Sequence, residues 1–162
     1  MKYFDKIIFV DTDDTARALM AAEIMRRKEL LSELQICSRG LVVLFPTPAN
    51  QKAEAVLANN GIRVKDHESK QLTQGDIDMR TLILTMETGQ KEKVRTSFRN
   101  VNHLYSIQEF TENMGDIPGL FGAELSVYGK CYELLDILVD KIVDKLNQAE
   151  IGKPLIREGS DR

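Results

Sequence analysis

The chain has 162 residues and a mass of 18.4 kDa, enough for one domain with a single sizeable core. Its net charge of -3 argues against nucleic acid and against an anionic membrane surface as partners. The longest apolar runs, residues 7–10 and 41–45, are far too short to cross a bilayer.

Strand-like and helix-like segments alternate in the first half of the chain. An apolar, β-branched run at residues 7–10 predicts a strand buried on both faces. Apolar residues at helical spacing follow over residues 15–34, with Asp14 or Thr15 as the N-cap. A short strand is expected at residues 36–38, stopped by Gly40. A helix capped by Asn50 then runs to residue 60, where Gly61 ends it.

The second half continues the alternation. It predicts a strand at residues 81–86, a polar helix at 90–98, a short strand at 102–105 and a long loop at 113–121. A closing helix follows over residues 124–148. This order predicts an α/β fold with a parallel sheet, in a single domain over residues 1–150. Residues 151–162 are expected to form a flexible tail.

The amino terminus and the cysteines bear on location. The first residues are interrupted by charge and lack the apolar core of a signal peptide. Cys37 and Cys131 form no C-x-x-C pair, which favours reduced, buried thiols. Together these features predict a cytoplasmic protein.

The loop after the first strand combines two opposing signals. A strand, a polar loop and a helix in succession are typical of a phosphate-binding loop, because backbone N–H groups and the helix dipole attract anions. The loop residues, however, bring three carboxylates and one arginine: Asp11, Thr12, Asp13, Asp14, Thr15, Ala16 and Arg17. That balance of charge is wrong for a phosphate.

Landmarks along nearly the whole chain resemble the low-molecular-weight protein tyrosine phosphatase family. That family carries a C-x-x-x-x-x-R loop, and Asp11 and Arg17 stand at its first and last positions here. Further matches are Ser38-Arg39-Gly40 for a Ser-Ala-Gly turn, Pro48-Ala49 for a Pro-Ala segment, His67 to Leu72 for a His-x-Ser/Ala-Arg-x-Leu segment, and Asp116 to Gly122 for the bacterial Asp-Ile-Pro-Asp-Pro-Phe-Gly segment. The resemblance implies a three-layer α/β/α sandwich with a short, four-stranded parallel sheet and a C-terminal closing helix.

Departures from the family pattern fall on its chemistry. Asp11 stands in place of the nucleophilic Cys, and Gly119 in place of the general-acid Asp, with Leu120 replacing the Pro after it. Arg17 remains from the phosphate-binding set, and Ser38 and His67 remain from the set that braces the loop. The rim of Gly119, Leu120 and Phe121, where the family recognises an aromatic ring, is expected to bind substrate or a partner.

These losses predict a catalytically impaired pseudophosphatase that acts as a binding or regulatory module. A phosphate dianion would meet Asp11, Asp13 and Asp14 as like charges, so the pocket is expected to prefer a protein or a small ligand with a cationic group. The alternative is an active phosphomonoester hydrolase of phosphotyrosine type that uses Asp11 with a divalent metal.

Two further interpretations of the loop are open. Asp11-Thr12-Asp13-Asp14-Thr15 also fits the D-x-D-x-T motif of haloacid-dehalogenase-type phosphatases, with Thr85 as a second-motif hydroxyl. Alternatively, Asp11, Asp13 and Asp14 hold Mg²⁺ or Ca²⁺ within the tyrosine-phosphatase-like fold. Without a metal, Asp13 and Asp14 would cap the helix while Asp11 pairs with Arg17.

Overall fold

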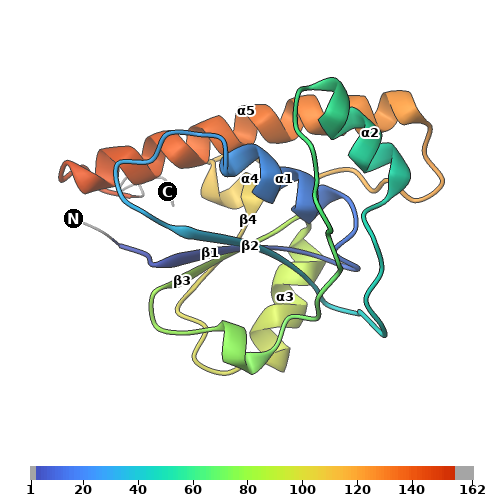
Figure 1. Cartoon of the computed structure of the whole chain (residues 1–162). Helices are drawn as coiled ribbons and strands as arrows, with labels where there is room; N and C mark the ends of the chain where they lie inside the picture. The colour runs from blue at the N-terminus through green and yellow to red at the C-terminus, as the bar shows by residue number, and fades with distance from the viewer. Residues whose placement is uncertain (1–2, 156–162) are drawn as a thin grey trace.

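The computed structural model describes residues 3–155 and has a parallel sheet at its centre (Figure 1). Four strands lie in the order β2-β1-β3-β4, all neighbours being parallel. The strands are β1 (Lys6–Asp11), β2 (Gln35–Gly40), β3 (Thr81–Thr85) and β4 (His103–Ser106). The predicted four-stranded parallel sheet is confirmed.

Helices cover both faces of the sheet, which makes the three predicted layers. They are α1 (Arg17–Met25), α2 (Gln51–Asn59), α3 (Thr88–Ser97), α4 (Ile107–Phe110) and α5 (Leu125–Glu150), with a short 3-10 turn, η1 (Gln74–Asp76). In Figure 1, α1, α2, α4 and α5 lie on one side of the sheet and α3 on the other. Within residues 3–155, no helix is both long and apolar enough to cross a membrane.

Strand β1 is buried on both faces because it runs through the centre of the sheet. Ile7 and Phe9 belong to the larger core, which α1, α2 and α5 complete. Ile8 and Val10 point the other way, into a smaller core that includes Val94 of α3. All four side chains are completely buried, as the continuous apolar run predicts.

The first helix is shorter than predicted. It ends at Met25 instead of residue 34, and its N-cap is Ala16 rather than Asp14 or Thr15. The reason for the early end lies in α5. There Asn147 accepts a hydrogen bond from the backbone N–H of Leu31 and donates one to the carbonyl of Glu29, at 2.9 and 3.0 Å. These contacts hold the chain after α1 in an irregular conformation, so tertiary contacts outweigh the helical spacing.

Other boundaries agree more closely with the sequence. Asn50 caps α2 by accepting the N–H groups of Lys52 and Ala53, and Gly61 follows the helix at φ +78°. The closing helix begins at Leu125 and extends to Glu150. The short helix α4 was not predicted. Of the predicted flexible tail, residues 156–162 lie outside the described residues.

The loop from Asp11 to Arg17 leaves the carboxyl end of β1 and packs against the end of β2. The N–H groups of Leu41 and Val42 donate to the carbonyls of Asp11 and Thr12 at 3.0 and 2.8 Å. A Cβ at Gly40 would lie 2.9 Å from the carbonyl carbon of Asp13. The backbone of the loop can approach β2 this closely because Gly40 has no side chain.

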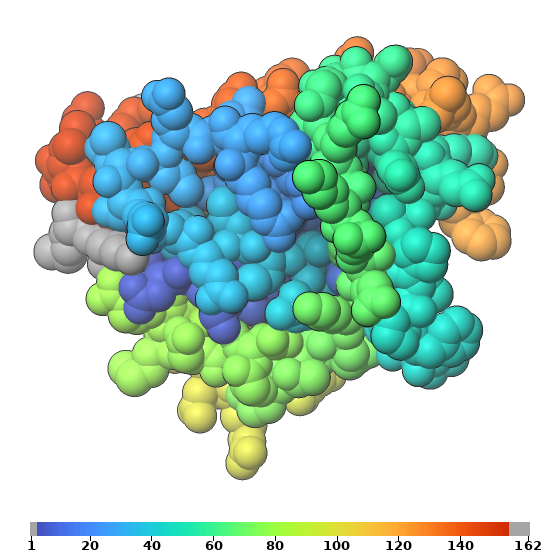
Figure 2. Space-filling view, viewed as in Figure 1, coloured from blue at the N-terminus to red at the C-terminus, as the bar shows by residue number. Residues whose placement is uncertain are grey.

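A second support comes from the segment that follows α2. In Figure 2 this green segment lies across the front of the molecule beside β2, and Gln71 forms a bridge with Gly40. Nε2 of His67 donates to the backbone carbonyl of Asp14 at 2.7 Å, and the N–H of Lys70 donates to Oδ2 of Asp14 at 3.0 Å. Asp14 itself has a left-handed backbone, with φ at +59°.

The burial of the Asp14 carboxylate is energetically unfavourable. Its side chain is buried, and Oδ1 accepts no hydrogen bond from any described residue. Burial raises the pKa of Asp14, and contacts with Ser38, Lys70, His67 and Arg39 offset this only in part. Asp14 therefore does not cap α1 as predicted: it is a buried brace of the loop, with one acceptor left unpaired.

The close approach at Gly40 gives a stability prediction. In Gly40→Ala, the new methyl group would lie 2.5 Å from Cγ2 of Val43 and 2.9 Å from the backbone of Asp13, so the loop must shift. We expect the free energy of unfolding to fall by about 1–3 kcal/mol in urea denaturation. Gly129→Ala in α5, where a Cβ meets nothing within 4 Å, is the control and should stabilise by about 0.5–1 kcal/mol. Equal effects at both sites would contradict the assigned packing.

Asp14 gives a prediction with a defined pH dependence. Asp14→Asn keeps the acceptor for Lys70 and suits a positive φ, but removes a buried charge, so it should stabilise by about 1 kcal/mol at pH 7. The pKa of Asp14 in the folded protein lies above its ordinary value of 3.8, so the penalty exists above the raised pKa and vanishes below 3.8.

The advantage of Asp14→Asn should therefore shrink as the pH falls through that window. Urea denaturation at pH 7 and at successively lower pH measures it. The control is Asp13→Asn, an exposed neighbour in the same loop, which should change stability by less than about 0.5 kcal/mol. A destabilised Asp14→Asn protein at pH 7 would show that the charge itself supports the loop.

Candidate functional site

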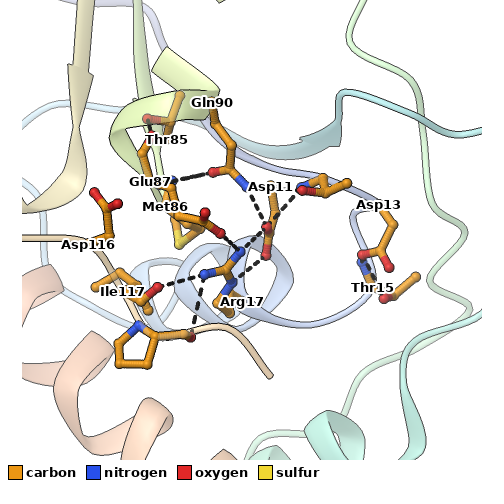
Figure 3. Close-up of polar contacts among 12 residues, drawn as sticks. Asp11, Asp13, Thr15, Arg17, Thr85, Met86, Glu87, Gln90, Asp116 and Ile117 are labelled. Carbon is orange, nitrogen blue, oxygen red and sulfur yellow. Dashed lines mark hydrogen bonds and ion pairs between the residues drawn. The ribbon is translucent and has the colours of Figure 1, made fainter. Parts of the chain in front are cut away.

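A pocket of about 760 Å³ opens above the loop at the carboxyl edge of the sheet. Its floor is the loop from Asp11 to Arg17, and its walls come from the start of α2, the end of β3 and the segment before α5. Parallel strands end at the same edge, and four separate parts of the chain meet there. Figure 3 shows the polar contacts on the floor of this pocket.

The guanidinium of Arg17 is fully engaged by the protein. Nε and Nη2 donate to the two carboxylate oxygens of Asp11 at 3.0 and 2.7 Å. Nη2 also donates to Oε2 of Glu87 at 2.5 Å. Nη1 donates to the backbone carbonyls of Ile117 and Pro118 at 2.7 and 3.4 Å. These five contacts match the five N–H donors of an arginine.

The ion pair is buried. Asp11 is 4% exposed and Arg17 is 6% exposed. Burial would lower the pKa of Arg17, but its bonds to Asp11 and Glu87 outweigh that effect and raise the pKa above its ordinary value. The guanidinium is therefore always charged, and the carboxylate of Asp11 lies against it as a bidentate partner.

Two residues that complete this site were not identified from the sequence. Glu87 follows β3 and reaches Arg17, as described above. Gln90, in the first turn of α3, donates from Nε2 to Oδ1 of Asp11 at 2.9 Å and to Oγ1 of Thr12 at 3.2 Å. Its Oε1 accepts the N–H groups of Met86 and Glu87, both at 3.0 Å. The sequence signal was slight: two polar residues just beyond the end of a buried strand.

Most of the acceptor sites on the Asp11 carboxylate are occupied by the protein, and Oδ1 has none left for a ligand. Oδ1 accepts from Arg17, Gln90 and the N–H of Thr12, the last at 2.8 Å, and Oδ2 accepts from Nε of Arg17. The predicted pairing of Asp11 with Arg17 is present in the structure, as a bidentate ion pair.

The three carboxylates of the loop do not converge. Asp11 faces Arg17, and Asp14 faces Lys70 behind the loop. Asp13 is exposed, and its Oδ1 accepts the N–H and the hydroxyl of Thr15 at 3.2 and 2.9 Å. Among residues 3–155, no three His, Cys, Asp or Glu side chains are grouped so that they could hold a metal ion. A divalent cation at Asp11, Asp13 and Asp14 stays a prediction that needs a different loop conformation.

No described thiol is placed as a nucleophile. Cys37 and Cys131 are both buried and unpaired. Burial raises the pKa of Cys131 to about 12, so this thiol is protonated at neutral pH.

The rim of the pocket lies in the segment before α5. Gly119 and Leu120 line the pocket, and the side chain of Phe121 is fully exposed at its mouth. The nearby carboxylate of Asp116 is turned away, because its Oδ1 accepts the N–H and the hydroxyl of Thr88, both at 2.8 Å. A wall residue, Tyr128, is buried beneath the pocket.

The loop-bracing residues lie behind the floor. His67 contacts the backbone of Asp14, as the family resemblance implies. Ser38, in β2, is buried near the side chain of Asp14. Thr85 is completely buried and donates its hydroxyl to the carbonyl of Glu87 at 2.9 Å, so it does not face the pocket.

Comparison with known proteins places this geometry in a family. Residues 6–151 match the family model described as low molecular weight phosphotyrosine protein phosphatase. The chain is 31% identical to a protein-arginine-phosphatase of Geobacillus stearothermophilus over 87% of this chain and 95% of that protein. It is 28% identical to the low molecular weight protein-tyrosine-phosphatase PtpB of Staphylococcus aureus, over 86% and 97% of the two chains.

A solved structure agrees with the fold. The YwlE arginine phosphatase from G. stearothermophilus superposes with a TM-score of 0.84 at 29% identity, over 92% of this chain and 97% of that one. The haloacid-dehalogenase interpretation of the fold is therefore wrong: the residues from Asp11 to Thr15 lie in a loop of another architecture. The chain belongs to the low molecular weight phosphotyrosine protein phosphatase family.

Proposed function

We propose that this protein is a non-catalytic member of its family, a pseudophosphatase whose pocket serves as a binding or regulatory module. One observation carries the proposal: every N–H donor of Arg17 already meets an acceptor of the protein. In phosphoryl transfer, an arginine of this kind acts by donating to the phosphoryl oxygens. Here the carboxylates of Asp11 and Glu87 take those donors.

The surroundings of Asp11, the residue at the nucleophile position, support the proposal. A carboxylate can attack phosphorus only if one of its oxygens is free and faces the substrate. Both oxygens of Asp11 accept hydrogen bonds from neighbours, and Asp11 is 4% exposed. Attack by Asp11 would require breaking its pair with Arg17 first.

The absence of a placed general acid supports it as well. Gly119 occupies the rim position at which the family resemblance implies an Asp. The carboxylate of Asp116 is bonded to Thr88 instead of facing the pocket. General acid catalysis is worth roughly a hundred- to ten-thousand-fold in rate, so this loss alone would be severe.

Charge at the pocket disfavours a phosphate. Asp11 and Arg17 neutralise each other, and the other charged residues of the lining, Asp13, Glu87 and Lys52, leave a net charge of -1. A like charge near 4 Å costs from about 1 kcal/mol in water to about 4 kcal/mol at an effective dielectric of 20. We therefore propose that the pocket favours a protein or a small ligand with a cationic group.

The relatives suggest what kind of partner the pocket has inherited. Those compared above are named as phosphatases of protein arginine and of protein tyrosine. Their names imply that the pocket of the family admits a side chain of another protein. We propose that this chain keeps that use of the pocket without the transfer of a phosphoryl group.

An assay of turnover tests the proposal against its alternative, a hydrolase that uses Asp11 with a divalent metal. We expect no hydrolysis of p-nitrophenyl phosphate with Mg²⁺, with Ca²⁺ or with a chelator, because Asp11 is bonded to Arg17. Metal-dependent turnover that disappears in Asp11→Asn would establish the alternative. Turnover that survives this substitution would contradict the non-catalytic proposal as well, because it would point to another group of the pocket.

A second prediction concerns the Asp11–Arg17 pair itself. Asp11→Ala leaves a buried guanidinium without its main partner, which typically costs about 3–5 kcal/mol. Phosphate then becomes a ligand for the freed donors, so it should raise the melting temperature of the variant and leave that of the wild type unchanged.

Thermal melts over a phosphate series, with a chelator present, measure this effect. Asp11→Asn is the milder second variant, and Asp116→Asn is the control, since that carboxylate lies outside the pair. Phosphate could instead raise the melting temperature of the wild type as much as that of Asp11→Ala. That result would contradict the view that Asp11 occupies the donors of Arg17.

A further inference from the structure

The pocket above the loop from Asp11 to Arg17 is open, although the donors of Arg17 are occupied. The net charge of its lining is negative, the reverse of that expected for a phosphate site. Among the charged residues that line it, Asp11, Asp13 and Glu87 are acidic and Arg17 and Lys52 are basic, so the net charge is -1. A lining that is acidic on balance attracts cations, and low-dielectric walls strengthen that field.

The two basic residues are already engaged. The donors of Arg17 are taken, as described above. Nζ of Lys52 donates to the carbonyl of Ala123 at 2.5 Å and lies 5.8 Å from the centroid of the Tyr128 ring. An aromatic ring of this wall therefore already holds a cation against its face.

The two other acidic residues, Asp13 of the loop and Glu87 of the wall, each keep part of the side chain exposed, although Glu87 also accepts from Arg17 and from the backbone N–H of Gln90. Asp13 is exposed, and among residues 3–155 its Oδ2 accepts no hydrogen bond. The side chain of Glu87 is 38% exposed and uses Oε2 for Arg17. Both residues belong to the lining of the same pocket.

Phe121 supplies an apolar contact at the mouth. Its relative exposure is 107%, so no part of the ring is covered by the protein. Because Phe121 also lines the pocket, its ring is accessible to a ligand that enters there. A flat cation stacks on such a ring better than a compact, strongly hydrated one.

We propose that this pocket binds the side chain of an unphosphorylated arginine of a partner protein. The guanidinium pairs with the carboxylates of Asp13 and Glu87 and stacks on Phe121. A phosphorylated arginine is rejected, because its phosphoryl group brings negative charge toward the same two carboxylates. This inference rests on the proposed function, since it names the partner of the same pocket.

Titration of capped peptides tests it: Ac-Ala-Arg-Ala-amide and matched peptides with citrulline, lysine or phosphoarginine. Citrulline keeps the shape of arginine but has no charge. We expect the arginine peptide to bind at least about tenfold more tightly than each of the others, a difference of about 1.4 kcal/mol. Binding should weaken as salt increases.

Variants connect the binding to the named residues. Asp13→Asn keeps the acceptor for Thr15 and Phe121→Ala changes an exposed side chain, so neither should disturb the fold. Each should weaken the arginine peptide by about threefold to tenfold. Asp116→Asn removes a nearby carboxylate that is turned toward Thr88, and it should leave the affinity unchanged.

Several outcomes would overturn the inference. The first is that the arginine peptide binds no more tightly than the citrulline or the lysine peptide. The second is that the phosphoarginine peptide binds more tightly, or that no peptide binds at millimolar concentration. The third is that Asp13→Asn and Asp116→Asn weaken binding of the arginine peptide equally. The proposed function fails separately. Metal-dependent turnover would overturn it whatever the peptides do, whereas absent turnover with absent arginine selectivity overturns this inference alone.

Discussion

The paired charges of Asp11 and Arg17 are the interaction on which the rest of the site depends. Burying two ions is costly, and a buried pair contributes to stability only if its geometry is good and the remaining donors and acceptors are bonded. Both conditions hold here: the pair is bidentate, and Gln90, Glu87 and the carbonyl of Ile117 bond the remaining groups. Loss of either charge would leave the other buried without its main ionic partner.

The same pair joins parts of the chain that are far apart in sequence. Arg17 begins α1, Glu87 follows β3, and Ile117 lies in the segment before α5. The guanidinium therefore links the floor of the pocket to two of its walls through charge-assisted hydrogen bonds, the strong kind in proteins. In an active phosphatase an anion would compete for these donors. Here the carboxylates of Asp11 and Glu87 accept hydrogen bonds from them.

The sequence predicted the sheet, the four longer helices and the loop, because burial patterns are local signals; it did not predict α4. It failed where distant contacts decide the structure. The helical spacing after Met25 is overridden by Asn147, more than a hundred residues later. Gln90 was expected only as the start of a polar helix, since no spacing rule links it to Asp11 across 79 positions. Asp14 looked like a helix cap, yet its left-handed backbone turns it behind the loop.

Arg17 has a structural role in this chain that does not depend on catalysis. In a loop that binds phosphate only intermittently, an arginine faces water between turnovers and its charge is solvated. Here Asp11 supplies a fixed carboxylate, so the arginine becomes a permanent structural link whose removal would leave a buried carboxylate uncompensated. A phosphate-binding arginine is therefore weak evidence of activity when the residue facing it is an acid. The residues that decide are those that face its five donors, because they determine whether any donor is left for a substrate.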